Sequence, residues 1–178
     1  MRKINVVASL VLIMATLAAW PQNARAQGKF EVVTGKAFET ALPKDFYLEG
    51  NAIPTEPRNA GMLKSSSLPR VLFALIDTAG YSSQIKQKYI GMAITEGRVS
   101  VCGTSVDVGS YGFGLEKPAA PSTADAKFHL YNQAGTEVAS CAAPRDATIK
   151  AAKPLQLIVS KEGSAWLILG RYKVEIKP

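Results

Sequence analysis

The chain has 178 residues, of which 47% are hydrophobic and 20% are charged, a composition typical of globular proteins and unlike that of disordered or collagen-like chains. It carries 21 Lys and Arg residues against 14 Asp and Glu residues, a net charge of +7. The basic residues are spread along the sequence, whereas nucleic-acid-binding proteins usually cluster them, so no nucleic-acid partner is expected.

The first 26 residues are predicted to be a secretory signal peptide. Two basic residues, Arg2 and Lys3, precede an apolar run over residues 4–20, and Ala24-Arg-Ala26 has the small-x-small pattern that signal peptidase recognises. The run is slightly short for a membrane-spanning helix, and no second long apolar run follows it. We therefore expect an exported protein, periplasmic or secreted, that begins at Gln27 and has no membrane span after leader removal.

Residues 27–178 are predicted to form one β-rich domain, since their number is usual for a single domain. The run Val71–Ile76 is apolar at every position, which predicts a central strand that is covered on both faces. Residues 89–95 predict its neighbour, and residues 78–88 between them predict a polar loop.

The segment before this strand pair is predicted to be mostly irregular. Short edge strands are expected at residues 30–34 and 46–48. Residues 50–61 contain two prolines and two glycines, and each proline lacks the N–H that a sheet interior requires, so a loop is expected there. Residues 62–67 fit either one helical turn or a continuation of that loop.

The segment after the strand pair predicts a series of hairpins. Glu96-Gly97 is a turn signal, and residues 98–102 alternate polar with apolar side chains, which predicts a hairpin with the strand before them. Two more hairpins are predicted by strand pairs around short polar turns: residues 127–131 with 136–141, and residues 155–159 with 165–169.

Three further stretches complete the chain. Residues 109–115 hold three glycines and two aromatic residues and predict a loop, and residues 118–126 predict a flexible connector. Residues 172–177 alternate strictly and fit either a separate last strand or the continuation of a long bulged strand.

Seven or eight strands, short hairpins and no convincing amphipathic helix predict an all-β fold, a single-domain antiparallel β-sandwich. A small up-and-down β-barrel is the alternative, because consecutive hairpins also build barrels and the strand register cannot be determined from one sequence.

Cys102 and Cys141 are the only cysteines, and each ends a predicted strand. In an exported chain an even number of cysteines favours disulfide pairing, so we expect a structural bridge between them. The sequence contains no Cys-x-x-Cys motif, the pattern that would indicate a redox centre.

No catalytic, metal or cofactor site is predicted. His129 is the sole histidine and lies within a predicted strand, so a histidine-based metal site or triad has too few partners. The carboxylates Asp77, Glu96 and Asp107 lie near predicted strand ends, but their spacing matches no catalytic signature.

The favoured function is that of an exported, non-enzymatic binding or accessory domain. Its partner is expected to be an envelope or extracellular protein, a glycan or a small apolar molecule, contacted through the loops at 78–88 and 109–115. Tyr81, Tyr111 and Phe113 are the candidate binding residues, because aromatic side chains on loops stack on sugars or fill pockets. The alternative is a small cell-envelope hydrolase that uses paired carboxylates.

Overall fold

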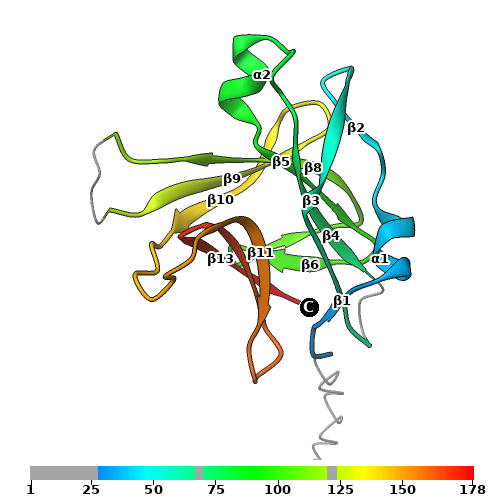
Figure 1. The fold of residues 1–178 in the computed structure, drawn as a ribbon, viewed down its shortest axis with the longest axis vertical. Helices are drawn as coiled ribbons and strands as arrows, with labels where there is room; N and C mark the ends of the chain where they lie inside the picture. The colour runs from blue at the N-terminus through cyan, green and yellow to red at the C-terminus, as the bar shows by residue number, and fades with distance from the viewer. Residues whose placement is uncertain (1–27, 67–69, 120–123) are drawn as a thin grey trace, which may run out of the picture.

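A computed structural model describes residues 28–66, 70–119 and 124–178. The predicted signal peptide at residues 1–26 and the middle of the predicted connector at 118–126 lie outside the described residues. The described chain forms two antiparallel sheets that do not close into a barrel, which confirms the β-sandwich prediction (Figure 1).

The first sheet has eight strands, in the order β1-β3-β4-β5-β8-β9-β10, with β2 paired to β3. Its strands are β1 (Glu31–Val33), β2 (Asp45–Leu48), β3 (Asn51–Lys64), β4 (Val71–Ile76), β5 (Gly91–Thr95), β8 (Gly109–Glu116), β9 (Ala126–Asn132) and β10 (Glu137–Ala143).

The second sheet has five strands, in the order β11-β12-β13-β6-β7. They are β6 (Val99–Val101), β7 (Thr104–Val106), β11 (Lys153–Val159), β12 (Ala165–Gly170) and β13 (Tyr172–Lys177). The hairpins β9–β10 and β11–β12 confirm their predictions, and β13 is a separate strand that pairs with β12.

The main core lies between the two sheets. Inward-facing side chains of the first sheet, including Phe73, Phe113 and Phe128, pack against Leu167 and Ile176 of the second. All five side chains are fully buried or nearly so. This core holds the sheets together by removing apolar surface from water.

A second core lies on the outer face of the first sheet and explains why β4 is apolar at every position. Here Leu72 and Met92 pack against β2 and two short helices, α1 (Lys36–Ala41) and α2 (Ser83–Lys88). Figure 1 shows α2 and β2 at the top of the molecule and α1 at its side. The prediction of a central strand covered on both faces is therefore confirmed.

The prediction that residues 78–88 form only a polar loop is wrong, because α2 occupies their second half. The helix begins after Ser82, whose side chain accepts a hydrogen bond from the N–H of Ile85. Ile85 is buried, and Tyr89, four residues later, follows it into the outer core. A capping serine and an apolar pair at i, i+4 are the sequence signals that predict this turn of helix.

The loop predicted at residues 50–61 is also wrong, because the 14-residue strand β3 runs through it. Its first residues pair with β2, and its last residues lie between β1 and β4. The ladder with β4 shifts register between Thr55 and Ala60, and Pro57 lies in that interval. Proline is compatible with a strand at such an irregularity, where no ladder donor is needed.

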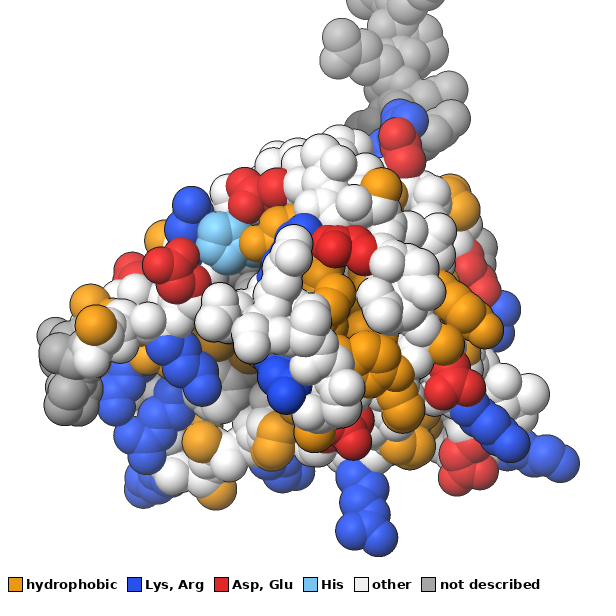
Figure 2. Space-filling view, turned by 90° about the horizontal axis from the view of Figure 1, so that it is seen from above, with side chains coloured by type: hydrophobic (Ala, Val, Ile, Leu, Met, Phe, Trp, Pro, Cys, Tyr) orange, Lys and Arg blue, Asp and Glu red, His pale blue; other side chains and the backbone are white. Residues whose placement is uncertain are grey.

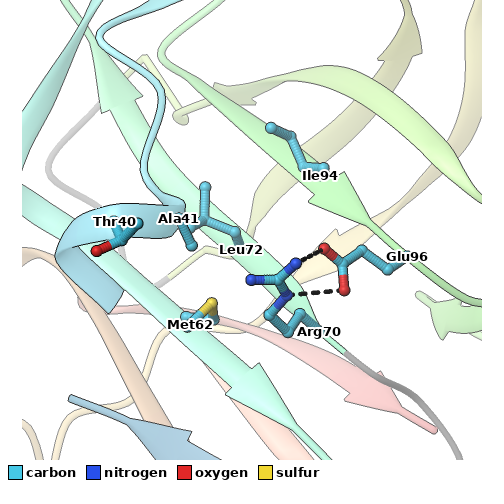
Figure 3. Close-up of a pocket in the computed structure, with 7 residues that line it drawn as sticks. All are labelled: Thr40, Ala41, Met62, Arg70, Leu72, Ile94 and Glu96. Atoms are coloured by element: carbon cyan, nitrogen blue, oxygen red, sulfur yellow. Dashed lines mark hydrogen bonds and ion pairs between the residues drawn. The ribbon is translucent and has the colours of Figure 1, made fainter. Parts of the chain in front are cut away.

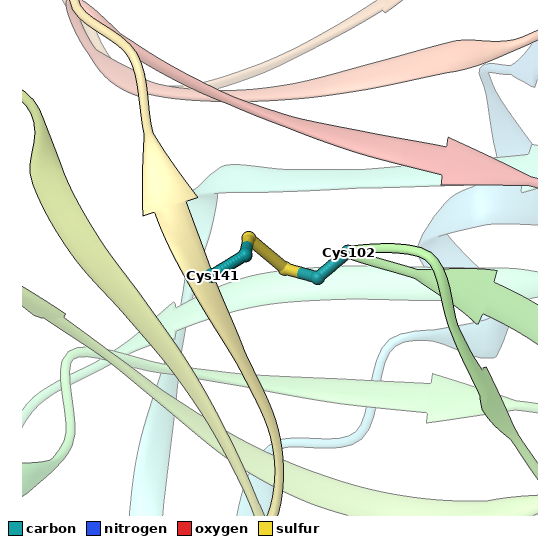
Figure 4. Close-up of a disulfide and its surroundings, with 2 residues drawn as sticks. All are labelled: Cys102 and Cys141. Carbon is teal, nitrogen blue, oxygen red and sulfur yellow. A yellow bond between two sulfur atoms is a disulfide. The ribbon is translucent and has the colours of Figure 1, made fainter.

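The hairpin predicted across Glu96-Gly97 is wrong as well, since β5 and β6 belong to different sheets. The turn carries the chain from the first sheet to the second, and the chain returns at β8, which pairs with β5. Cys102, just after β6, is joined to Cys141 in β10 by a disulfide, with a Cα–Cα distance of 5.6 Å (Figure 4). The predicted bridge thus links the two sheets.

The glycines of residues 109–115 lie in strand β8, so the predicted loop is wrong. They allow close approach from α2: a Cβ at Gly112 would lie 2.7 Å from the ring of Tyr89, and one at Gly114 would lie 2.2 Å from the carbonyl oxygen of Lys88. Close packing therefore requires glycine at positions 112 and 114, and the glycines do not interrupt the strand.

Candidate functional site

Of the three aromatic residues predicted to bind a partner, Phe113 lies in the main core. Its side chain is 0% exposed and contacts the rings of Phe73 and Phe128, at centroid distances of 6.4 and 5.7 Å. Successive side chains of a strand alternate between faces, and position 113 faces the second sheet. Phe113 therefore offers no surface to a partner.

Tyr111 and Tyr81 are half-buried, and both hydroxyl groups are used within the chain. The hydroxyl of Tyr111 donates to the carbonyl of Asp107 at 2.8 Å, and that of Tyr81 donates to the carbonyl of Ala52. Burial raises the pKa of Tyr111, so its phenol stays protonated at neutral pH. The structure does not bring the three predicted binding residues together into one surface.

The three carboxylates considered for acid–base chemistry do not form a pair, because two of them are hydrogen-bonded to arginine side chains and the third lies far from both. Glu96 accepts a hydrogen bond from Arg70 at 2.8 Å, and Asp107 accepts one from Arg98 at 2.8 Å. Asp77 follows the last residue of β4, whereas the Arg70–Glu96 pair lies at the start of that strand. A six-residue strand spans about 20 Å, so Asp77 is far from the other two.

His129 lies on the outer face of β9 between two glutamates. Its Nδ1 is 2.6 Å from Glu137 and its Nε2 is 3.6 Å from Glu116, and its ring stacks on Tyr131. Figure 2 shows the histidine flanked by acidic side chains. The hydrogen bond with His129 lowers the pKa of Glu137. Within the described ranges, no group of three or more His, Cys, Asp or Glu side chains is arranged to hold a metal ion.

A clamp at Glu49 connects the tip of the β2–β3 hairpin to α2. Its Oε1 accepts hydrogen bonds from Lys88 Nζ and the Tyr89 hydroxyl, both at 2.6 Å, and Lys88 also donates to the carbonyl of Gly135 at 2.8 Å. The bond from Lys88, aided by that from Tyr89, lowers the pKa of Glu49. The tip is thereby fixed over the outer face of β8 and β9.

We expect Glu49→Gln to lower the free energy of unfolding at neutral pH by about 1 to 3 kcal/mol, because Lys88 loses a charged partner. The pKa of Glu49 is lower in the folded chain than its usual value of 4.5. Its carboxylate therefore stabilises the fold above about pH 4.5, and this contribution is lost as the pH falls through the folded pKa. Urea unfolding measured from about pH 7 to about pH 3 should show the variant and the parent protein converging in acid.

Glu39→Gln is the matched control, because Glu39 is exposed on α1 and its side chain has no hydrogen bond or ion pair among the described residues. It should leave both the stability and its pH dependence unchanged. If Glu49→Gln kept the full acid sensitivity of the parent protein, the clamp would not be the cause.

Three cavities adjoin α1. One is an open hollow of about 510 Å³ along the helix, lined by Lys36, Ala37, Thr40, Ala41 and Arg70, and the other two reach β3. The smaller, about 200 Å³, is lined by Met62, Leu72 and Ile94 beneath the helix, and the Arg70–Glu96 ion pair forms one wall (Figure 3). The larger is an open groove of about 620 Å³ between α1 and the irregular part of β3, and it mixes apolar residues with charges of both signs. Neither of these two reaches the space between the sheets.

A further cavity, which we call the sheet-end cavity, opens between the two sheets at one end of the sandwich. It has a volume of about 400 Å³. Its lining residues are Leu75, Ile90, Leu115, Lys117, Pro154, Leu169 and Gly170. They come from both sheets, with Leu75 in β4 and Leu115 in β8 on one side, and Pro154 in β11 and Leu169 in β12 on the other.

The sheet-end cavity is an unfilled end of the main core. Leu75, Ile90 and Leu115 pack against that core but remain half-exposed, whereas Phe73 and Phe113, two residues back on β4 and β8, are covered. Ligand sites are typically concave, mostly apolar and of about 300 to 1,000 Å³, with a few polar groups at fixed positions. This cavity fits that description, with Lys117 as its charged group.

Comparisons of the chain with protein-family models, with curated proteins and with solved structures find no match. In the part of the chain that the structure describes, no helix combines the length and the apolar character needed to cross a membrane. The disulfide between Cys102 and Cys141 is compatible with an exported protein.

Proposed function

We propose that the protein is an exported, non-enzymatic binding domain that holds a small apolar molecule in the sheet-end cavity. The observation that carries this proposal is the half-exposure of Leu75, Ile90 and Leu115, which belong to the main core yet line an open cavity. Export is supported by the leader pattern at residues 1–26 and by the cysteine pair.

The physical basis of such binding is the removal of apolar surface from water. Each square ångström of apolar surface buried contributes about 25 cal/mol, so a ligand that covers the exposed parts of these side chains gains affinity without specific hydrogen bonds. The lining residues lie on strands or directly beside them, and the two sheets hold them in place. A preformed site of this kind loses little conformational entropy on binding.

Filling the cavity with a larger side chain tests the proposal. We expect Leu115→Trp to weaken the binding of a neutral alkyl probe, decanol, at least tenfold, because the indole occupies the space of the ligand. Isothermal titration calorimetry measures the affinity, and thermal unfolding shows that the variant remains folded.

Ile158→Trp is the matched control, since Ile158 is an apolar residue of β11 that is 41% exposed and does not line the cavity. It should bind decanol as the parent protein does. If the parent protein failed to bind decanol, or if Leu115→Trp bound it with unchanged affinity, the proposed site would be wrong.

A further inference from the structure

The net positive charge of residues 28–178 is concentrated at the end of the sandwich that holds the sheet-end cavity. The connecting segments 116–119, 124–127, 144–153 and 170–173 carry seven basic and three acidic residues, a net charge of +4. The rest of residues 28–178 carries eleven basic and eleven acidic residues, a net charge of zero. In Figure 2 several Lys and Arg side chains gather at one edge of the molecule.

One basic residue of the cavity lining and two that adjoin lining residues in sequence are called here the mouth cations: Lys117, Lys153 and Arg171. Lys117 lines the cavity itself. Lys153 and Arg171 directly adjoin the lining residues Pro154 and Gly170 in sequence. All three are exposed, and none of their side chains has a hydrogen bond or ion pair with another described residue.

The acidic residues of the same segments do not neutralise the mouth cations, because each is engaged elsewhere. The carboxylate of Glu116 lies 3.6 Å from His129 on the outer face of the first sheet. Asp125 accepts a hydrogen bond from the backbone N–H of Arg145 at 3.3 Å. Asp146 is bound by Thr148 at 2.6 Å and by Lys173 at 3.5 Å.

An apolar cavity with unpaired cations at its opening complements one kind of molecule. We propose that the ligand of the sheet-end cavity is a single-chain amphiphile with an anionic head group, whose alkyl chain enters between the sheets while its head group contacts the mouth cations. This inference rests on the proposed function and adds the chemical class of the ligand. The apolar walls supply affinity, and the charges select the head group.

Three probes with the same alkyl chain and different head groups separate the inference from the proposed function: decanoate, decanol and decylamine. Calorimetry should show decanoate binding about three- to tenfold more tightly than decanol, and decylamine more weakly than either. Raising the salt concentration from about 0.05 to about 0.5 M should remove the preference for decanoate and leave decanol binding unchanged.

The variant for this test replaces all three mouth cations by methionine: Lys117→Met, Lys153→Met and Arg171→Met. It should bind decanoate and decanol equally. Lys161→Met is the control, because Lys161 is exposed in the β11–β12 turn, at the opposite end of β11 from Lys153, and it should keep the preference.

The outcomes distinguish the two claims. If decanol and decanoate bind the parent protein equally, the head-group inference is wrong and the proposed function stands. If none of the three probes binds, both are wrong. If the protein binds anionic phospholipid vesicles through the mouth cations but does not bind decanoate, the charged end recognises a membrane surface, and the inference of a single-chain ligand is overturned.

Discussion

Phe113→Ala should lower the free energy of unfolding by about 3 to 5 kcal/mol, the usual cost of removing a large aromatic side chain from a packed core. The ring is fully buried between Phe73 and Phe128, on the face of β8 that contacts the second sheet. Its removal leaves a cavity that the surrounding strands cannot fill without losing their own pairing. Urea or thermal unfolding measures the loss directly.

Tyr47→Ala is the control, because it also removes an aromatic side chain, but from a position outside the core. Tyr47 lies on β2 and is 63% exposed, so its removal should change stability by no more than about 0.5 kcal/mol. Loss of ligand affinity in Phe113→Ala without loss of stability would place the ring on a binding surface, and the description of the core would then be wrong.

Removing the disulfide should have a comparable effect. The double variant Cys102→Ala, Cys141→Ala is expected to be about 2 to 5 kcal/mol less stable, because the bridge closes a long loop, with 39 residues of sequence separation, and restricts the unfolded chain. It also joins the β6–β7 pair to β10, so its loss weakens one attachment between the sheets.

Denaturant unfolding with and without a thiol reductant tests this second effect. Reductant should destabilise the parent protein to the level of the double variant and leave the double variant unchanged. Titration of two free thiols in the unfolded, unreduced parent protein would show that the bridge does not form.

The features that the sequence predicts correctly are those set by local pattern. The continuous apolar run of β4 indicates a strand buried on both faces, and the polar turns of β9–β10 and β11–β12 lie between clear strands. The presence of just two cysteines in a chain with a leader pattern predicts that they form a disulfide with each other. These patterns depend on residues that are close in sequence or few in number.

The incorrect predictions concern residues whose role is decided by distant partners. Pro57 suggests a loop, but the ladder of β3 shifts register around it. The glycines at 112 and 114 also suggest a loop, although they make room for Tyr89 and for the backbone of Lys88. From sequence alone, a glycine or proline that serves close packing or a strand irregularity looks the same as one that forms a turn, because its neighbours in space are unknown.

The sheet-end cavity is unpredictable from sequence for the same reason. Leu75 and Leu115 continue the alternation that begins with inward-facing Phe73 and Phe113, so the pattern predicts that they are buried. Their exposure follows from how far the second sheet extends over the first, which depends on strand register and sheet packing. The mouth cations, in turn, are ordinary surface residues until the cavity places them around an opening.

The chain crosses between the sheets three times, after β5, β7 and β10, so neither sheet is built from one uninterrupted stretch of sequence. During synthesis, β4 and β5 are made long before β11, β12 and β13 are available to cover their inner face. A chain that ended before β11 would expose Val71, Phe73 and Ala93, together with unpaired strand edges, and such surfaces favour aggregation. We therefore expect such a truncated chain to aggregate or be degraded by proteases, and not to fold into a smaller stable protein.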